Sequence, residues 1–245
     1  MRLIQFLVIF LTGIAILMIV KYTGGLSDYL IPPLHEILLV TGRDWTDFFM
    51  PAMNTTSVAV AGHVFALFLA AVVAFIARTG SRVAGLVRTA AYNLQAYPVV
   101  AIAPIVFIFL GDGLASRLLI AALICYFPLL LSFLGIFSDP VVDVEHFFRQ
   151  IGKLNSTTEL SIRIFENLDK IITVVTGSGT LAMVGTIVAE FLAASNGIGY
   201  VIRKSLYQNN LAAILASLFF IGLFSSVYLM TVEFIGRTIK TRLAD

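Results

Sequence analysis

The segment Asp139–Lys170, DPVVDVEHFFRQIGKLNSTTELSIRIFENLDK, is the one long polar stretch between two strongly apolar ones. The flanking stretches, Leu118–Phe137 and Ile171–Ala194, are each long enough to cross the hydrocarbon core of a bilayer, which takes about 20 helical residues. The whole chain is 59% hydrophobic and 12% charged, whereas a soluble domain carries roughly 25% charged residues. The composition therefore predicts an integral membrane protein.

Six continuously apolar stretches qualify as membrane-spanning helices. None alternates with the period of two residues that a barrel strand shows, so the predicted fold class is an all-α membrane protein with six transmembrane helices. The third span has an alternative start near Val83, as an extension outside the membrane. We expect residues 1–245 to form a single transmembrane domain, with spans at about 3–20, 57–77, 92–110, 118–137, 171–194 and 211–235.

The distribution of Lys and Arg orients these helices. If the N-terminus is cytoplasmic, eleven of the 16 basic residues lie in cytoplasmic segments, as the positive-inside rule requires. Both termini and the polar loop 138–170 are then cytoplasmic. On the outer side, Leu34–Val40 follows two prolines and is predicted to form a short interfacial helix.

The polar loop is predicted to fold as two short amphipathic helices around a turn at Gly152-Lys153-Leu154-Asn155. Gly152 relaxes the backbone for the turn, and Ser156–Glu159 matches a capping box that would start the second helix. From the residues alone two interpretations stay open: a docking helix that inserts into a groove on a partner, or a surface helix on the membrane. The apolar stripes are Val144, Phe147, Phe148 and Ile151, then Leu160, Ile164 and Leu168.

Two ionisable residues inside the predicted spans are candidates for a pathway or gate. Glu190 lies only about 6 Å from the outer end of the fifth span, so its insertion costs less than the roughly 2.5–3.5 kcal/mol of a central charge. It either bonds loop amides near Gly197 and Gly199, or belongs to a gate with these glycines and Tyr200. His63 is either a hydrogen-bonded structural histidine or a polar lining group. Neither has partners at metal-ligand spacing.

Recurrent small residues on the second and fifth spans allow close helix packing. Packing within the chain is one interpretation, and a subunit interface or a pore lining is the other. The residues are Ala59, Ala61, Gly62, Ala66, Ala70 and Ala71, then Gly177, Gly179, Ala182 and Gly185.

Missing motifs restrict the chemistry. The sequence has no Gly-x-x-x-x-Gly-Lys-Ser/Thr loop, so ATP binding of the P-loop kind is not expected. No Ser/His/Asp or His-Glu-x-x-His arrangement falls on a span, and we expect no catalytic residue, metal site or cofactor. A net charge of +2 is too small to indicate a nucleic-acid partner.

Several pieces of sequence resemble the inner-membrane permease subunits of binding-protein-dependent ABC importers, in the branch for sulfonates, taurine, nitrate, bicarbonate and some vitamin precursors. The resemblance covers residues from about 54 to 242. It rests on the order and spacing of the pieces taken together. They are Tyr97-Pro98-Val99-Val100-Ala101-Ile102-Ala103-Pro104, Phe109-Leu110-Gly111-Asp112-Gly113, Tyr126-Phe127-Pro128, Ala189-Glu190-Phe191-Leu192 and Gly197-Ile198-Gly199-Tyr200.

In this family the loop between the fourth and fifth spans carries Glu-Ala-Ala, then Gly six residues after the Glu, and docks on an ATPase subunit. Gly152 matches the glycine, whereas His146, Phe147 and Phe148 occupy the Glu-Ala-Ala positions and Glu145 is displaced by one. The resemblance therefore implies a coupling loop in which the residues at the Glu-Ala-Ala positions differ from those usual in the family. Its residues are His146, Phe147, Phe148, Arg149, Gln150, Gly152 and Lys153.

The resemblance implies a type I permease in a bacterial inner membrane that forms a pathway for a small solute. The implied solute is either a small organic or inorganic anion, such as a sulfonate or nitrate, or a vitamin precursor. The implied partners are ABC ATPase subunits, a second permease subunit, an extracytoplasmic solute-binding protein and the lipid bilayer. The alternative is a secondary transporter or channel acting without an ATPase.

The departures in the coupling loop suggest a heterodimer in which a different permease carries the usual Glu-Ala-Ala residues. This hypothesis predicts two kinds of permease chain in the purified complex. Mass spectrometry of a tagged complex that finds two copies of this chain and no second permease would reject it.

Overall fold

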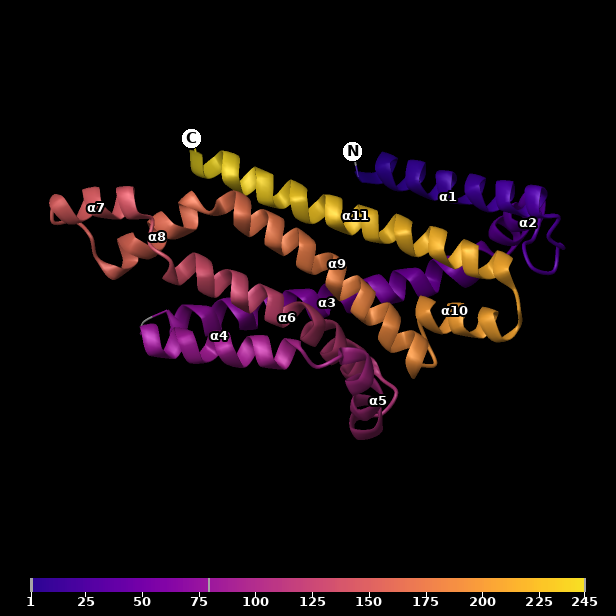
Figure 1. Ribbon diagram of the computed structural model, residues 1–245, viewed down its shortest axis with the longest axis horizontal. Coiled ribbons are helices and arrows are strands. Elements are labelled where there is room, and N and C mark those ends of the chain that lie inside the picture. Colours follow the sequence, from indigo (N-terminus) through magenta and orange to yellow (C-terminus); the bar gives the residue numbers. More distant parts are fainter. Residues whose placement is uncertain (1, 79, 245) are drawn as a thin grey trace.

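The computed structural model describes residues 2–78 and 80–244. The regular secondary structure of these residues is entirely α-helical (Figure 1). The helices are α1 (Arg2–Gly24), α2 (Leu34–Arg43), α3 (Trp45–Ala77), α4 (Ser81–Gln95), α5 (Val99–Leu110), α6 (Leu114–Ser138), α7 (Val142–Gln150), α8 (Ser156–Glu166), α9 (Leu168–Leu192), α10 (Ile198–Tyr207) and α11 (Leu211–Ala244).

Five helices of the described part, namely α1, α3, α6, α9 and α11, are long and apolar enough to cross a membrane. They contain five of the six predicted spans, and the short interfacial helix predicted at Leu34–Val40 is present as α2. Helix α3 begins at Trp45, well before the predicted start. With 33 residues it measures about 50 Å, so it exceeds the roughly 30 Å hydrocarbon core and must extend into the interface.

The third predicted span, 92–110, was wrong as a single helix. The chain forms α4, of 15 residues, and α5, of only 12. Pro98 stands between them, and a proline has no amide hydrogen to continue a helix and disfavours the helical conformation of the residue before it. The alternative start near Val83 falls inside α4, which is a separate and more polar helix.

The long helices α3, α6, α9 and α11 run lengthwise between two ends of the molecule, and α1 lies mainly beside the N-terminal half of α11 (Figure 1). We call the end that carries α7 and α8 the hairpin end, and the end that carries α2 and α10 the far end (Figure 1). Arg78, just after α3, bonds Ser156 at the hairpin end. Arg117, in the first turn of α6, bonds Asn54 in the far half of α3. Residues 80–113 therefore return the chain from one end to the other through two short helices instead of one long one.

Helix α6 packs between α3 and α9 in the main buried apolar cluster. Alanines on one face of α3 let the backbones approach, and a Cβ on Gly62 would lie 2.7 Å from Cβ of Ala121. A Cβ on Gly185 would lie 2.7 Å from Cδ1 of Ile124. Packing within the chain thus accounts for these small residues. Gly177 and Ala61 differ, because a Cβ on Gly177 would meet no atom within 4 Å and Ala61 is exposed.

Helix α1 packs on α11 and not in the central cluster. Phe6 and Phe10 contact Phe219, with ring centroids 6.1 and 5.3 Å apart. Arg2 donates to Glu233 at 2.6 Å. This ion pair sets the start of α1 beside the half of α11 that leads to the hairpin end.

Candidate functional site

The predicted pair of helices around a turn is present as the hairpin α7–α8 at one end of the molecule (Figure 1). Gly152 adopts φ +68°. Its amide donates to the carbonyl oxygen of Arg149, and that of Lys153 donates to Phe148. These two bonds are those of a Schellman turn, which needs a residue in the left-handed region and so favours glycine. Gly152 therefore ends α7 sharply and turns the chain toward α8.

The second helix starts where the sequence predicts, but with a different cap. Asn155 is the N-cap residue, and its Oδ1 accepts from the amide of Thr158 at 2.8 Å. Ser156 is instead the first helical residue. The predicted capping box was wrong because asparagine caps a helix as well as serine does, and Glu159 is occupied by other partners.

Most of the predicted coupling-loop residues lie on the outward surface of the hairpin. The ring of Phe147 is exposed and makes an edge-to-face contact with that of Phe148, which is half-buried. Phe148 lines a groove of about 590 Å³ between the hairpin and Leu243 at the end of α11. The exposed surface is thus aromatic and basic. Its members are His146, Phe147, Arg149, Gln150, Gly152 and Lys153.

A buried arginine holds the hairpin against α6. Arg163 donates from Nε to Glu145 Oε1 at 2.7 Å and from Nη2 to Oε2 at 3.2 Å. Its Nη1 donates to the carbonyl oxygens of Phe137 and Ser138, at 2.7 and 3.1 Å. These are among the last carbonyls of α6, which have no partner inside their own helix and carry the negative end of its dipole. Nη2 also lies 2.8 Å from Glu159.

This arrangement leaves Glu145 unavailable to another protein. Its side chain is 5% exposed, and the hydrogen bonds from Arg163 hold the pKa of its carboxyl below the usual range. The acid that stands one position from the family's glutamate is therefore ionised and used inside the chain. Nothing in the sequence marks Arg163 for this role, because it is one of several basic residues in the loop.

A second arginine joins the hairpin to α3. Arg78 donates from Nη2 to Oγ of Ser156 at 2.9 Å, and its Nη1 lies 4.0 Å from Glu159. The sequence does not reveal either contact, because Ser156 lies 78 residues after Arg78 and Glu159 lies further still.

At the far end, Glu190 is fully buried and paired. Its Oε2 accepts from Thr55 at 2.6 Å and from the amide of Gly199 at 3.1 Å. Its Oε1 lies 3.2 Å from Nη1 of Arg117, which also donates to Asn54 at 2.8 Å. One carboxylate thus joins α3, α6, α9 and α10. Such full pairing is what a charge needs when it leaves water.

Gly197 and Gly199, beside Glu190, leave no room for a side chain. Gly197 has φ +93°, and a Cβ there would lie 2.1 Å from Cδ of Glu190. A Cβ on Gly199 would lie 2.3 Å from the carbonyl oxygen of Ile187. The structure therefore brings three of the five candidate gate residues together. The fourth, Tyr200, is half-buried and lies nearby against Arg203, whose guanidinium is 5.4 Å from its ring centroid.

His63 lies apart from this cluster, where α3 meets α9 and α11. Its Nδ1 is 2.5 Å from the hydroxyl of Tyr228, and its Nε2 is 2.7 Å from Oγ of Ser178. Ser178 donates its one hydroxyl hydrogen to the carbonyl of Val175, so it accepts from Nε2, and Tyr228 donates to Nδ1. Ser178 and Glu190 are 12 residues apart on α9, or about 18 Å.

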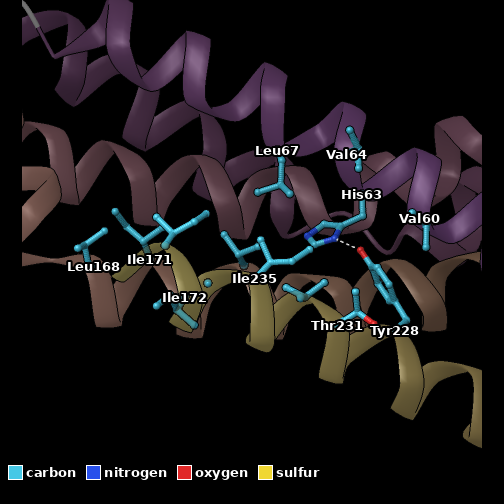
Figure 2. A pocket seen from close by; sticks show the side chains of 14 residues that line it. Val60, His63, Val64, Leu67, Leu168, Ile171, Ile172, Tyr228, Thr231 and Ile235 are labelled. Atoms are coloured by element: carbon cyan, nitrogen blue, oxygen red, sulfur yellow. Dashed lines mark hydrogen bonds between the residues drawn. The ribbon is translucent and has the colours of Figure 1, made fainter. Parts of the chain in front are cut away.

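Figure 2 shows His63 and Tyr228 meeting across a cavity of about 490 Å³. Apolar side chains of α3, α9 and α11, such as Leu67, Ile172 and Ile235, form the remaining walls. His63 itself is 1% exposed, so both of its ring nitrogens serve to join helices. Glu190 lies inside the packing of the helices, and His63 is buried beside this cavity, where it forms part of the wall.

The long apolar helices define a multi-pass α-helical membrane protein. The hairpin α7–α8 is its polar end, and the Glu190 cluster and His63 are polar groups buried among its helices. No protein-family model matches the chain. It is 24% identical over 200 residues to the formylaminopyrimidine transport permease protein ThiX of Halalkalibacterium halodurans, covering 80% of this chain and 79% of the relative. It is 29% identical over 116 residues to the riboflavin transport system permease protein RibX of Chloroflexus aurantiacus, covering 44% and 41%.

These similarities support an ABC importer membrane permease as the function of this chain, and with the apolar helices they support a bacterial inner membrane as its place. One relative is named for the transport of formylaminopyrimidine and the other for the transport of riboflavin. The sulfonate, taurine and nitrate branch of the resemblance receives no support.

The far-end cluster predicts a non-additive effect on stability. Arg117→Met leaves the Glu190 carboxylate buried without its cation, so we expect a loss of about 3–5 kcal/mol in the free energy of unfolding. In Arg117→Met/Glu190→Gln the neutral amide needs no cation, so this variant should be more stable than Arg117→Met alone. Unfolding in mixed detergent micelles, measured for both single variants and the double, gives the coupling energy. Additive losses would contradict the pairing.

Proposed function

We propose that residues 1–245 act as one permease domain that forms, with a second permease subunit of the same or another kind, the membrane pathway of an ATP-driven importer. The hairpin α7–α8 is then the cytoplasmic coupling element, and both termini are cytoplasmic. ATP hydrolysis belongs to partner subunits, and an extracytoplasmic binding protein delivers the solute at the far end. No bond chemistry falls to this chain.

The observation that carries this proposal is the hairpin itself. It offers an exposed aromatic and basic surface, while the arginines Arg163 and Arg78 tie its inner side to α6 and α3. A helix that merely rests among lipid headgroups has no need of such ties. A helix that receives force from a partner does, because movement must pass to the spans.

A second support for the topology is the return of residues 80–113 between the two ends. Counted as one broken crossing, α4 and α5 complete the six crossings of the predicted architecture. The exposed apolar side chains of α5, Ile108 and Phe109 among them, then face lipid or the second subunit, since exposed apolar patches of this kind are characteristic of such surfaces.

For the solute we propose a vitamin-related nitrogen heterocycle, in line with the names of the two relatives. The absence of an unpaired charge in the far-end cluster supports this choice. Arg117 and Glu190 neutralise each other there, so the cluster offers no fixed charge for an anion. Selectivity would rest mainly with the binding protein.

Reconstitution distinguishes this function from a secondary transporter or channel. We expect proteoliposomes holding the chain, its co-purifying ATPase and the binding protein encoded beside it to accumulate formylaminopyrimidine or riboflavin only when ATP is present. The control is the same vesicle with a non-hydrolysable nucleotide. Flux through the purified chain alone, without ATP, would support the alternative, and accumulation of taurine or nitrate instead would overturn the solute class.

The docking surface can be tested on its own. In Phe147→Ala/Phe148→Ala, we expect co-purification of the ATPase to fall by about tenfold or more, since truncating a central aromatic anchor commonly costs 2 kcal/mol or more. Phe147→Ala alone should share much of the loss, because this ring is 57% exposed and contributes little to packing. The matched control is Tyr207→Ala, an exposed aromatic residue at the far end. Full assembly and full transport in the double variant would refute the docking role.

A further inference from the structure

The hairpin's outer helix has few ties to the remainder of the molecule. No residue of α7 belongs to the buried apolar clusters found in residues 2–78 and 80–244. Helix α8 differs, because Leu160 and Ile164 pack against the central cluster. The groove lined by Phe148 and Leu243 separates the hairpin from the end of α11. The position of α7 therefore depends chiefly on polar contacts.

Those contacts converge on one side chain. Arg163 is 6% exposed and belongs to α8. It binds both carboxylate oxygens of Glu145 in α7 and two of the last carbonyls of α6, those of Phe137 and Ser138. A guanidinium can do this because its donors form a rigid planar fork. The link thus joins three helices with a fixed geometry.

Helix α6 is also bound to its neighbours at its N-terminal end, which lies toward the far end of the molecule. Arg117, in its first turn, binds Asn54 of α3 and Glu190 of α9. The 25 residues of α6 span about 37 Å. An arginine at each end thus ties this one helix both to the hairpin and to the cluster that closes the far end of the subunit.

We propose that Arg163 is the positioning residue through which movement of α7 passes to α6, and that α6 carries the movement to the Arg117–Glu190 pair at the far end. This proposal rests on the proposed function, because it takes α7 to be the helix that an ATPase moves. The proposal adds that docking and transmission are separate properties of the hairpin: the aromatic surface around the exposed ring of Phe147 docks, and the buried guanidinium of Arg163 transmits the movement.

The test separates these two properties in the assembled complex. Asn196 lies exposed in the loop between α9 and α10, so Asn196→Cys carries a nitroxide label at the far end. The native Cys125 is fully buried, which directs the label to the introduced thiol. In nanodiscs, the label's mobility is recorded before and after addition of Mg·ATP, and the co-purifying ATPase is quantified in the same sample.

In Arg163→Gln we expect the ATPase to co-purify as it does with the unsubstituted chain, while the ATP-dependent change at the label falls by about tenfold, a size typical of substitutions within a coupling network. Arg163→Lys should restore only part of the signal, since an ammonium lacks the fork that holds Glu145 and the carbonyls together. Glu145→Gln, which keeps the guanidinium, gives a milder variant should Arg163→Gln fail to fold. The control is Arg242→Gln, which removes the same charge from an exposed position of α11.

Each outcome bears on one of the two ideas. A full ATP-dependent change in Arg163→Gln and Glu145→Gln would overturn the transmission role and leave the proposed function intact. Loss of the ATPase together with the signal would also overturn it, since Arg163 would then only shape the docking surface. Failure of the unsubstituted chain to bind any ATPase would overturn the proposed function and this inference with it.

Discussion

Burial of charge is the constraint on which this structure depends. A chain with so few polar residues cannot leave an ion unpaired inside its packing, because the lost hydration is not recovered. Its two most buried carboxylates, Glu190 and Glu145, are each matched to an arginine and to further hydrogen bonds. Because the partners come from different helices, each pair also fixes how those helices sit relative to one another.

The two pairs lie at opposite ends of α6 and have different consequences. At the far end the carboxylate of Glu190 gathers four helices around two glycines that leave it room. At the hairpin end Arg163 gathers α7, α8 and the last carbonyls of α6. Between them, apolar packing and the His63 hydrogen bonds hold the long helices. This division explains why Glu190 and His63 are both buried and fully hydrogen-bonded, although Glu190 and Ser178, the partner of His63, lie about 18 Å apart along α9.

The departures of the polar loop from the pattern of the permeases that the chain resembles have a structural explanation. Glu145 is displaced by one position, and it faces Arg163 inside the hairpin instead of a partner outside it. Phe147 takes the outward place. The exposed surface of the hairpin accordingly carries basic and aromatic side chains, while the carboxylate of Glu145 is turned inward.

The sequence by itself determined the membrane class, five of the long helices, the place of the hairpin and its turn at Gly152, because apolar length and turn chemistry are local properties. It did not determine the break at Pro98, since a proline within an apolar run can either kink a membrane helix or end it. It also could not pair Glu145 with Arg163, nor Glu190 with Arg117 and Thr55. These partners stand 18 to 135 residues apart, and only the packing of α6 against α3 and α9 decides which buried charges meet.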